Sequence, residues 1–199
     1  NQLKAETFEQ EVHSRTALVS EFSKATQRYV ASQVKPAIAD ETDALVLEGM
    51  SSFFATRSLF EEFNQVLPEY TYRAPTLNPL NSANQADEFE TELIRKFQAD
   101  RKLPELSGYR QQNGVEQFYI AKPTTVRASC LTCHGNPDDA PTEIVDRYGK
   151  TQGYGWEPGE ILSAAMIYVP TGDLRANQAV LHRTIMTTFV CLVLALAGI

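Results

Sequence analysis

The sequence predicts an α+β fold in which an antiparallel sheet is flanked by helices. Three observations carry this prediction. Apolar residues recur with helical spacing over residues 3–35, the pair Asn113-Gly114 separates two segments typical of strands, and the apolar segment 161–170 indicates a buried strand. Helices fall mostly early and strands mostly late, which favours an antiparallel sheet. With 199 residues, 43% of them hydrophobic, the chain can bury one sizeable core.

Residues 3–35 are predicted to form one long helix, which Pro36 is expected to end at Lys35 because proline lacks a backbone donor. Its apolar positions recur near the helical period: Phe8, Val12, Leu18, Val19, Phe22, Ala25, Tyr29 and Val30. One small domain does not cover a stripe of this length, so we expect a partner helix and a homodimer. His13 is expected to lie at the surface or at an interface and not to ligate a metal.

A second helix is predicted over residues 51–67, with Ser51-Ser52 as its cap and Pro68 after its end. Its apolar residues are expected to share one face and to wall a pocket: Phe53, Phe54, Leu59, Phe60 and Phe63. Residues 68–73 then alternate briefly like a strand. The turn-forming residues that follow are Pro75, Asn78, Pro79, Asn81 and Asn84.

A third helix is predicted over residues 85–100, with Asn84 as its cap. Its buried stripe is Phe89, Leu93, Ile94 and Phe97. Asn113-Gly114 is the preferred pair for a type I′ turn, so residues 108–112 and 115–121 are predicted to form a hairpin.

The last third of the chain is predicted to contain a short helix over residues 141–149, with Gly149 at its C-terminal end. Three glycines then mark a flexible connector around Trp156: Gly153, Gly155 and Gly159. The strand 161–170 follows, and Asp173 is expected to cap a last helix.

That last helix is expected to run into the membrane. Residues 184–199 carry no charge, which is typical of the start of a transmembrane helix, although a buried C-terminal helix is the alternative. Cys191 lies in this segment and is interpreted as a small apolar residue. We also expect an earlier membrane span before Asn1. The organisation expected is a stalk helix over 1–35, a domain over 36–172, and a C-terminal helix with the start of a membrane segment over 173–199.

Composition excludes some classes of function. The net charge is −7 and the sequence pI is about 5.0, and no cluster of Lys and Arg is available to neutralise phosphates, so nucleic acid is not an expected partner. No hydrolytic triad, phosphate-binding loop or pair of catalytic carboxylates is recognisable, so the chain is not expected to be an enzyme.

The motif Cys130-Leu131-Thr132-Cys133-His134 has the spacing by which haem c is attached. Each thiol takes one vinyl group of the porphyrin in a thioether bond, and His134 can ligate the iron from the proximal side. We therefore expect one covalently attached haem c, with its iron, per chain. Because such attachment takes place outside the cytoplasm, the domain is expected in the periplasm or a lumen, anchored to the membrane.

Three further roles for the two cysteines fit less well. A thioredoxin-like dithiol would begin a helix, but Gly135 and Pro137 end any helix here. A structural zinc site needs four ligands, and the remaining His and Cys residues lie on predicted helices remote from the motif: His13, His182 and Cys191. A disulfide or two buried thiols is the remaining alternative.

Several stretches of the chain resemble one known family, the PAS-like c-type haem sensor domains. They are Met50-Ser51 with Ala55-Thr56-Arg57 and Phe60, residues 76–90, residues 130–141 and residues 146–170. This family supplies a stand-alone cyanobacterial redox sensor and the extracytoplasmic input modules of bacterial histidine kinases, diguanylate cyclases and chemoreceptors. The resemblance covers about residues 30 to 172. It implies an antiparallel sheet flanked by helices, haem bound by Cys130 and Cys133, and His134 as an axial ligand.

The sixth iron ligand is the point at which this chain departs from that family. In the stand-alone member a cysteine near the first helix is the second ligand, and this chain has no cysteine before Cys130. The candidates are Met50, Met166 and an open position. Arg57 is the lone charge in the first two turns of its helix and suits a haem propionate, or else is a solvated arginine.

Two functions are compatible with the sequence. The first is a sensor domain, in which haem detects redox state or a small gas and the long helices carry the signal through the membrane. The alternative is a membrane-anchored electron-transfer cytochrome c with a redox partner. The paired long helices favour the sensor.

Overall fold

The computed structural model describes residues 2–68 and 70–197, with the side chains of all of these except 2–5, 173–179, 181–182 and 194–197. It contains a four-stranded sheet of order β1-β4-β3-β2, in which every neighbouring pair is antiparallel. The strands are β1 Thr71–Arg73, β2 Leu106–Gln112, β3 Val115–Thr125 and β4 Ile161–Pro170. The α+β fold with an antiparallel sheet is confirmed.

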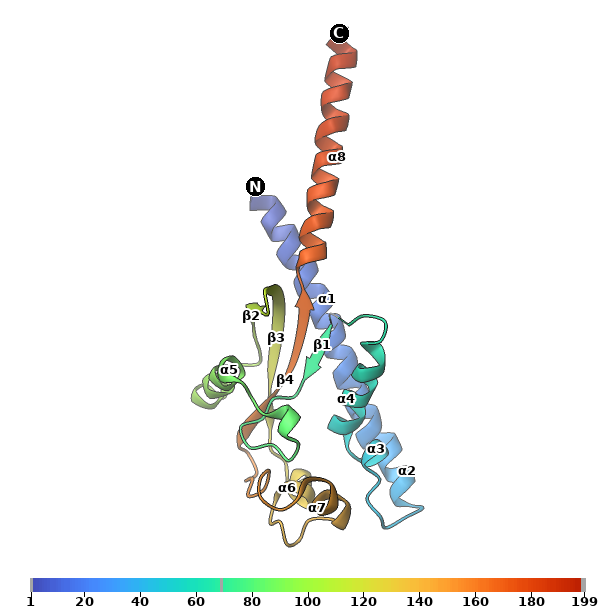
Figure 1. Ribbon diagram of the computed structural model, residues 1–199, viewed down its shortest axis with the longest axis vertical. Coiled ribbons are helices and arrows are strands. Elements are labelled where there is room, and N and C mark those ends of the chain that lie inside the picture. The colour runs from blue at the N-terminus through green and yellow to red at the C-terminus, as the bar shows by residue number, and fades with distance from the viewer. Residues whose placement is uncertain (1, 69, 198–199) are drawn as a thin grey trace.

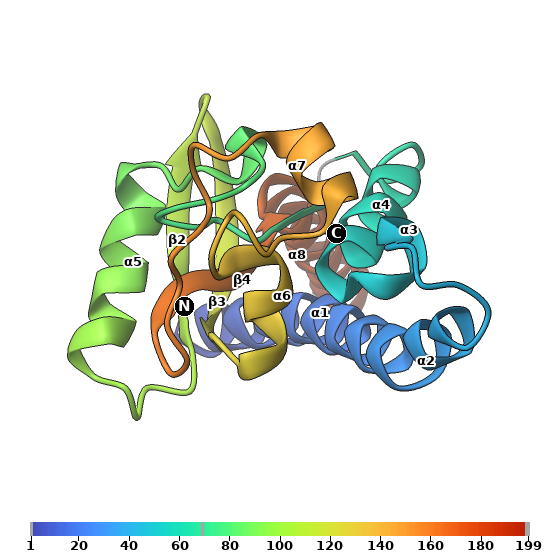
Figure 2. The same ribbon diagram turned by 90° about the horizontal axis from the view of Figure 1, so that it is seen from below.

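Helices cover both faces of the sheet, with α5 on one face and α1 and α4 on the other (Figure 1). The helices are α1 Gln2–Tyr29, α2 Lys35–Ala39, α3 Leu47–Met50, α4 Ser52–Phe63, α5 Glu88–Ala99, α6 Leu131–His134, α7 Thr142–Tyr148 and α8 Gly172–Ala197. The short helices α6 and α7 lie at the end of the sheet opposite α8, and the view from below shows them in front (Figure 2).

The N-terminal helix α1 is a layer of the domain. Phe8 and Val12 pack on Phe118 and Ile120 of β3, so part of the expected stripe is covered within the chain. Other residues of that stripe remain exposed: Leu18 by 72%, Phe22 by 57% and Tyr29 by 61%. The stripe therefore divides into a face that covers the sheet and a face that no described residue covers.

Pro36 does not end the first helical segment at Lys35, and this prediction was wrong. After α1 the chain forms a π-helical turn over Val30–Val34, in which the N–H of Lys35 bonds to the carbonyl of Val30. Pro36 then stands in the first turn of α2, where no backbone donor is needed, and helical structure continues to Ala39.

Helix α4 begins as predicted, because the side chain of Ser51 accepts a hydrogen bond from the N–H of Phe54. It ends at Phe63, earlier than expected. Its apolar residues do not share one face. Phe60 stacks on Tyr72 with 5.0 Å between ring centroids, whereas Phe54 faces the region of α7.

Helix α5 begins at Glu88 with Asp87 as its cap, so the prediction of Asn84 as the cap was wrong. Asp87 accepts a hydrogen bond from the N–H of Glu90, and the carboxylate of Glu90 accepts one from the N–H of Asp87. This reciprocal pair satisfies two backbone donors at the helix start, and Asn84 cannot form it from its place in a preceding 3₁₀ turn.

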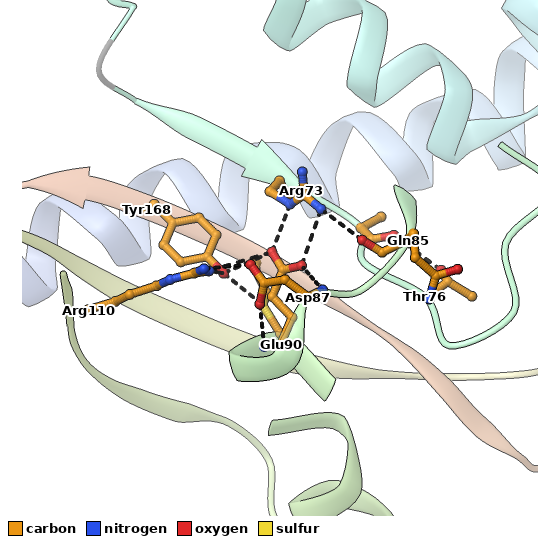
Figure 3. A network of polar contacts seen from close by, with 9 residues as sticks. Arg73, Thr76, Gln85, Asp87, Glu90, Arg110 and Tyr168 are labelled. Carbon is orange, nitrogen blue, oxygen red and sulfur yellow. Dashed lines mark hydrogen bonds and ion pairs between the residues drawn. The ribbon is translucent and has the colours of Figure 1, made fainter. Parts of the chain in front are cut away.

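The carboxylate of Glu90 is fully buried at the centre of a polar network (Figure 3). It accepts two hydrogen bonds from Arg73, at 2.7 and 3.2 Å, and one from the hydroxyl of Tyr168 at 3.1 Å. Arg110 completes the network by binding Asp87 at 2.5 Å. These contacts tie α5 to β1, β2 and β4. We call these five residues the α5 clamp.

The hairpin is confirmed. Asn113 and Gly114 join β2 to β3 with φ angles of 52° and 80°, as a type I′ turn requires. The predicted end of α7 at Gly149 is also confirmed, with a φ of 73°.

Helix α8 begins at Gly172 and extends away from the domain (Figure 1). The side chains of Asp173 and His182 lie outside the described residues. Among the residues that are described, we find no helix whose length and hydropathy suffice to cross a bilayer. The membrane segment expected for 184–199 is therefore not supported. Cys191 is exposed.

Candidate functional site

The cysteine-histidine motif lies on a tight turn that follows β3. Ala128–Cys130 form a 3₁₀ turn, α6 follows at once, and Gly135 ends it by donating a hydrogen bond to the carbonyl of Leu131 at 2.9 Å. A Cβ atom on Gly135 would lie 2.6 Å from that carbonyl oxygen, so only glycine fits. Cys130 and Cys133 stand three residues apart on this turn, half-buried and unbonded to each other.

The imidazole of His134 is held in one tautomer. Its Nδ1 lies 2.7 Å from the carbonyl oxygen of Gly153. Because a carbonyl can only accept, Nδ1 must carry the hydrogen, and the neutral ring then has its free lone pair on Nε2. Burial lowers the pKa of His134, and the bond to Gly153 opposes that effect. The result is a neutral imidazole whose Nε2 can ligate a metal.

Asn78 holds the segment that carries the Gly153 carbonyl. Its Oδ1 accepts a hydrogen bond from the N–H of Gly153 at 2.8 Å, and its Nδ2 donates to the carbonyl of Tyr154 at 3.0 Å. Its own carbonyl accepts from Nε1 of Trp156 at 3.2 Å. Sequence reasoning interpreted Asn78 only as a turn residue. Nothing in the sequence pairs it with residues about 75 positions away.

Trp156 covers one side of the histidine. Its ring stacks on that of His134 with 3.7 Å between centroids and 12° between planes. The segment is fixed by backbone bonds as well, from Trp156 N–H to the carbonyl of His134 at 3.0 Å and from Gly155 N–H to that of Gly135 at 2.9 Å. The predicted flexible connector is thus a structured part of the site.

Gly153 cannot be replaced without moving its neighbours. Its φ is +85°, and a Cβ atom there would lie 2.4 Å from the backbone nitrogen of Leu80. The glycine therefore lets this segment approach the loop of Asn78 closely enough for the contacts described above.

An apolar wall stands beside Cys133. It consists of Leu47, Leu80 and Ile144, with Phe54, Tyr148 and Tyr154 packed around them. Burial raises the pKa of the Cys133 thiol, an effect that Lys35 opposes.

Two guanidinium groups meet at Phe54. Arg57 lies 5.0 Å from the ring centroid and Arg147 lies 5.1 Å from it. The Nε of Arg57 is buried without a hydrogen-bond partner among the described residues, although Glu61 lies 3.4 Å away without the alignment of a hydrogen bond. Sequence reasoning missed Arg147, because its place beside Phe54 depends on how α7 docks against α4.

The two candidate methionines occupy different regions. Met50 ends α3, the helix that begins with Leu47 of the apolar wall, and its sulfur lies 3.2 Å from the backbone nitrogen of Val46. Met166 is fully buried on the α5 side of the sheet, where its sulfur lies 3.2 Å from the hydroxyl oxygen of Tyr168.

Two further predictions concern His13 and the alternative of a structural zinc site. His13 is at the surface as predicted, 3.7 Å from Glu105. Within the described residues, no group of three or more His, Cys, Asp or Glu side chains is arranged to hold a bare metal ion.

Comparisons with known proteins agree with this architecture. A family model described as Tll0287-like matches residues 4–170. The crystal structure of the cyanobacterial haem protein Tll0287 is similar in fold, with a TM-score of 0.61 and 17% sequence identity over 80% of this chain and 95% of that chain. No curated protein matches this sequence.

Proposed function

This chain belongs to the Tll0287-like family, and on that premise we propose that it is a haem-binding domain that holds one haem c through Cys130, Cys133 and His134. The resemblance to the PAS-like c-type haem sensor domains is confirmed by the family match and the fold. The similar structure is that of a haem protein.

One observation supports the proposal most strongly. The bond from Nδ1 of His134 to the Gly153 carbonyl directs the free lone pair to Nε2, and the same turn carries two unbonded thiols. A proximal ligand to haem needs this tautomer, and thioether attachment needs these thiols. The donor set therefore fits haem c.

Other residues would hold the remainder of the group. Among the described residues, the N–H at the buried Nε of Arg57 has no hydrogen-bond partner, and Arg147 supplies a second positive charge near the same Phe54 ring. Guanidinium groups bind carboxylates well, so these arginines would bind the two propionates. When bound, haem supplies a reversible one-electron change and an iron site for a small gas. The apolar wall would exclude water from that site.

We propose that the domain is a sensor of redox state or of a diatomic gas. It would be anchored to the membrane and exposed to the periplasm or a lumen. Support comes from the covalent attachment motif, from the exposed apolar side chains of α8, such as Ile185, Phe189 and Leu192, and from the contact between α1 and α8. Self-association through the exposed face of α1 is part of this proposal.

Electron transfer is the alternative. Cys130 and Cys133 are only half-buried, and α6 lies at the end of the domain opposite α8 (Figure 1). This placement favours a carrier, because a carrier needs an accessible haem edge. Reduction by a soluble donor with no response to CO or NO would favour the carrier over the gas sensor.

The test of the proposal is haem staining of a denaturing gel. Protein from a host that matures cytochromes c should carry haem that survives denaturation. The double variant Cys130→Ala, Cys133→Ala should lose the stain completely, while Cys191→Ala keeps it. A wild-type chain that does not stain would overturn the proposal.

A further inference from the structure

The loop that contains Asn78 and the segment 153–156 together form a bracket around His134, defined here as Asn78, Gly153, Tyr154 and Trp156. Asn78 contacts each of the other three, and Gly153 and Trp156 contact the histidine ring. The ring is thus held at one edge by a hydrogen bond and across one face by stacking. Those two contacts fix its rotation about the Cβ–Cγ bond.

We propose that Asn78 and Trp156 are positioning residues that set the plane and the basicity of the His134 imidazole and, through them, the reduction potential of the haem. This inference rests on the proposed function. Neither residue is placed to touch iron itself, and each acts through the histidine.

The two residues act by different physical routes. Asn78 holds the Gly153 carbonyl 2.7 Å from Nδ1, and a hydrogen bond at that nitrogen makes the ligand more basic. A more basic ligand stabilises ferric iron and lowers the potential. Trp156 instead covers the ring and keeps water from it. Water near the iron stabilises the extra charge of the ferric form, so the cover raises the potential.

These routes predict shifts of opposite sign. Asn78→Ala removes the side chain that holds the N–H of Gly153, so the Gly153 carbonyl is no longer fixed against Nδ1 of His134. Trp156 keeps its bond to the main-chain oxygen of residue 78. The imidazole becomes less basic, and the reduction potential should rise. Trp156→Leu removes the cover while the Gly153 bond remains, so the potential should fall. In both variants the ferric EPR lines should broaden, because the imidazole plane is no longer fixed.

Conservative variants and a matched control accompany these two. Trp156→Phe keeps a stacking ring and should restore the narrow lines. Asn78→Gln keeps an amide with both the acceptor for Gly153 and the donor for Tyr154, and adds no charge, so it should lie closer to wild type than Asn78→Ala. The control is Asn136→Ala. Asn136 is two residues from His134, and among the described residues its side-chain amide forms hydrogen bonds with Asp138 and Asp139 of its own loop, so neither readout should change.

The measurement is a redox titration with EPR on the haem-loaded protein, after staining has shown equal haem content. Opposite shifts in Asn78→Ala and Trp156→Leu support the proposal. Unchanged potentials and line widths in both overturn it, as do equal shifts in Asn136→Ala. If the two severe variants do not incorporate haem, Trp156→Phe and Asn78→Gln decide: line widths and potentials far from wild type in both would overturn the proposal. A wild-type chain without haem would instead be a failure of the proposed function.

Discussion

The α5 clamp differs from the turn that carries Cys130, Cys133 and His134, which we call the proposed haem-attachment turn, in how far the described chain satisfies its polar groups. In the clamp, both oxygens of Glu90 are occupied by Arg73, Tyr168 and the N–H of Asp87, and the carboxylate is fully buried. At the turn, the lone pair of His134 Nε2 is left available. Nearby on α4, the buried Nε of Arg57 has no hydrogen-bond partner among the described residues. Other residues of the chain provide hydrogen-bond partners for the Glu90 carboxylate of the clamp. At the turn and beside it, hydrogen-bonding groups are left without partners among the described residues. A polar cluster that its own chain satisfies serves stability, whereas one left incomplete is suited to a ligand.

The largest effect is expected when the clamp is broken. Glu90→Ala leaves the guanidinium of Arg73 without its buried partner, which should lower the free energy of unfolding by about 3–5 kcal/mol. Denaturant unfolding of both proteins measures this. The control is Glu92→Ala on the same helix, which removes an exposed pair with Lys96 worth about 0.5 kcal/mol. Equal losses in both variants would show that the clamp is not a special source of stability.

The second-largest effect is expected at the exposed face of α1, which no described residue covers. Leu18, Phe22, Ala25 and Tyr29 are exposed at alternating spacings of four and three residues, the pattern of a helix pairing with a copy of itself. Leu18→Ser with Phe22→Ser should weaken self-association by about tenfold or more, equivalent to about 1.4 kcal/mol. Sedimentation at several concentrations measures this, with the exposed Val66→Ser as control. A wild-type protein that stays monomeric at high concentration would refute the dimer.

A smaller effect is expected from the pH dependence of the clamp. Partial burial tends to raise the pKa of Asp87, but hydrogen bonds from the Glu90 N–H and from Arg110 outweigh it and hold that pKa below its ordinary value. The unfolded chain therefore takes up this proton at a higher pH than the folded chain. The contribution to stability is complete at neutral pH and is lost as the pH falls below about 4, through the folded-state pKa.

Asp87→Asn tests this contribution. Because the Asp87 side chain is 40% exposed, solvent screening limits the effect to about 1 kcal/mol. Asparagine keeps the helix cap, so the change isolates the charge. Unfolding curves at several pH values should show wild type and variant differing near neutral pH and converging in acid. A difference that grows in acid would contradict the sign.

The smallest effect is expected at Met50. It tests whether a haem bound at the proposed haem-attachment turn has an open position on the distal side of its iron. The sulfur of Met50 already contacts the N–H of Val46, so we expect the distal iron position to be open. Met50→Ala should then leave the rate of CO uptake by the ferrous protein unchanged, as should the control Met186→Ala on α8. Faster uptake in Met50→Ala alone would establish Met50 as the sixth ligand.

Much of the fold could be predicted from the sequence because the determining contacts are local. The cap of α4 at Ser51 and the hairpin turn at Asn113-Gly114 each depend on residues within a few positions of one another. The attachment motif is local too, since its spacing alone brings two thiols and a histidine onto one turn. Such features depend on backbone geometry that the neighbouring residues set by themselves.

Only the tertiary structure decided the features that join distant segments. Pro36 remains within helical structure because of a π-helical turn before it, and Arg147 reaches Phe54 because α7 docks beside α4. The contacts of Asn78 also depend on tertiary structure, because its partners lie about 75 residues away in the sequence. So does the hydrogen bond that Tyr168 of β4 donates to Glu90 of α5. The sequence by itself supplied the motif at which we propose that haem is attached. How the histidine is held, and which region remains incomplete, depends on packing between segments that no local pattern records.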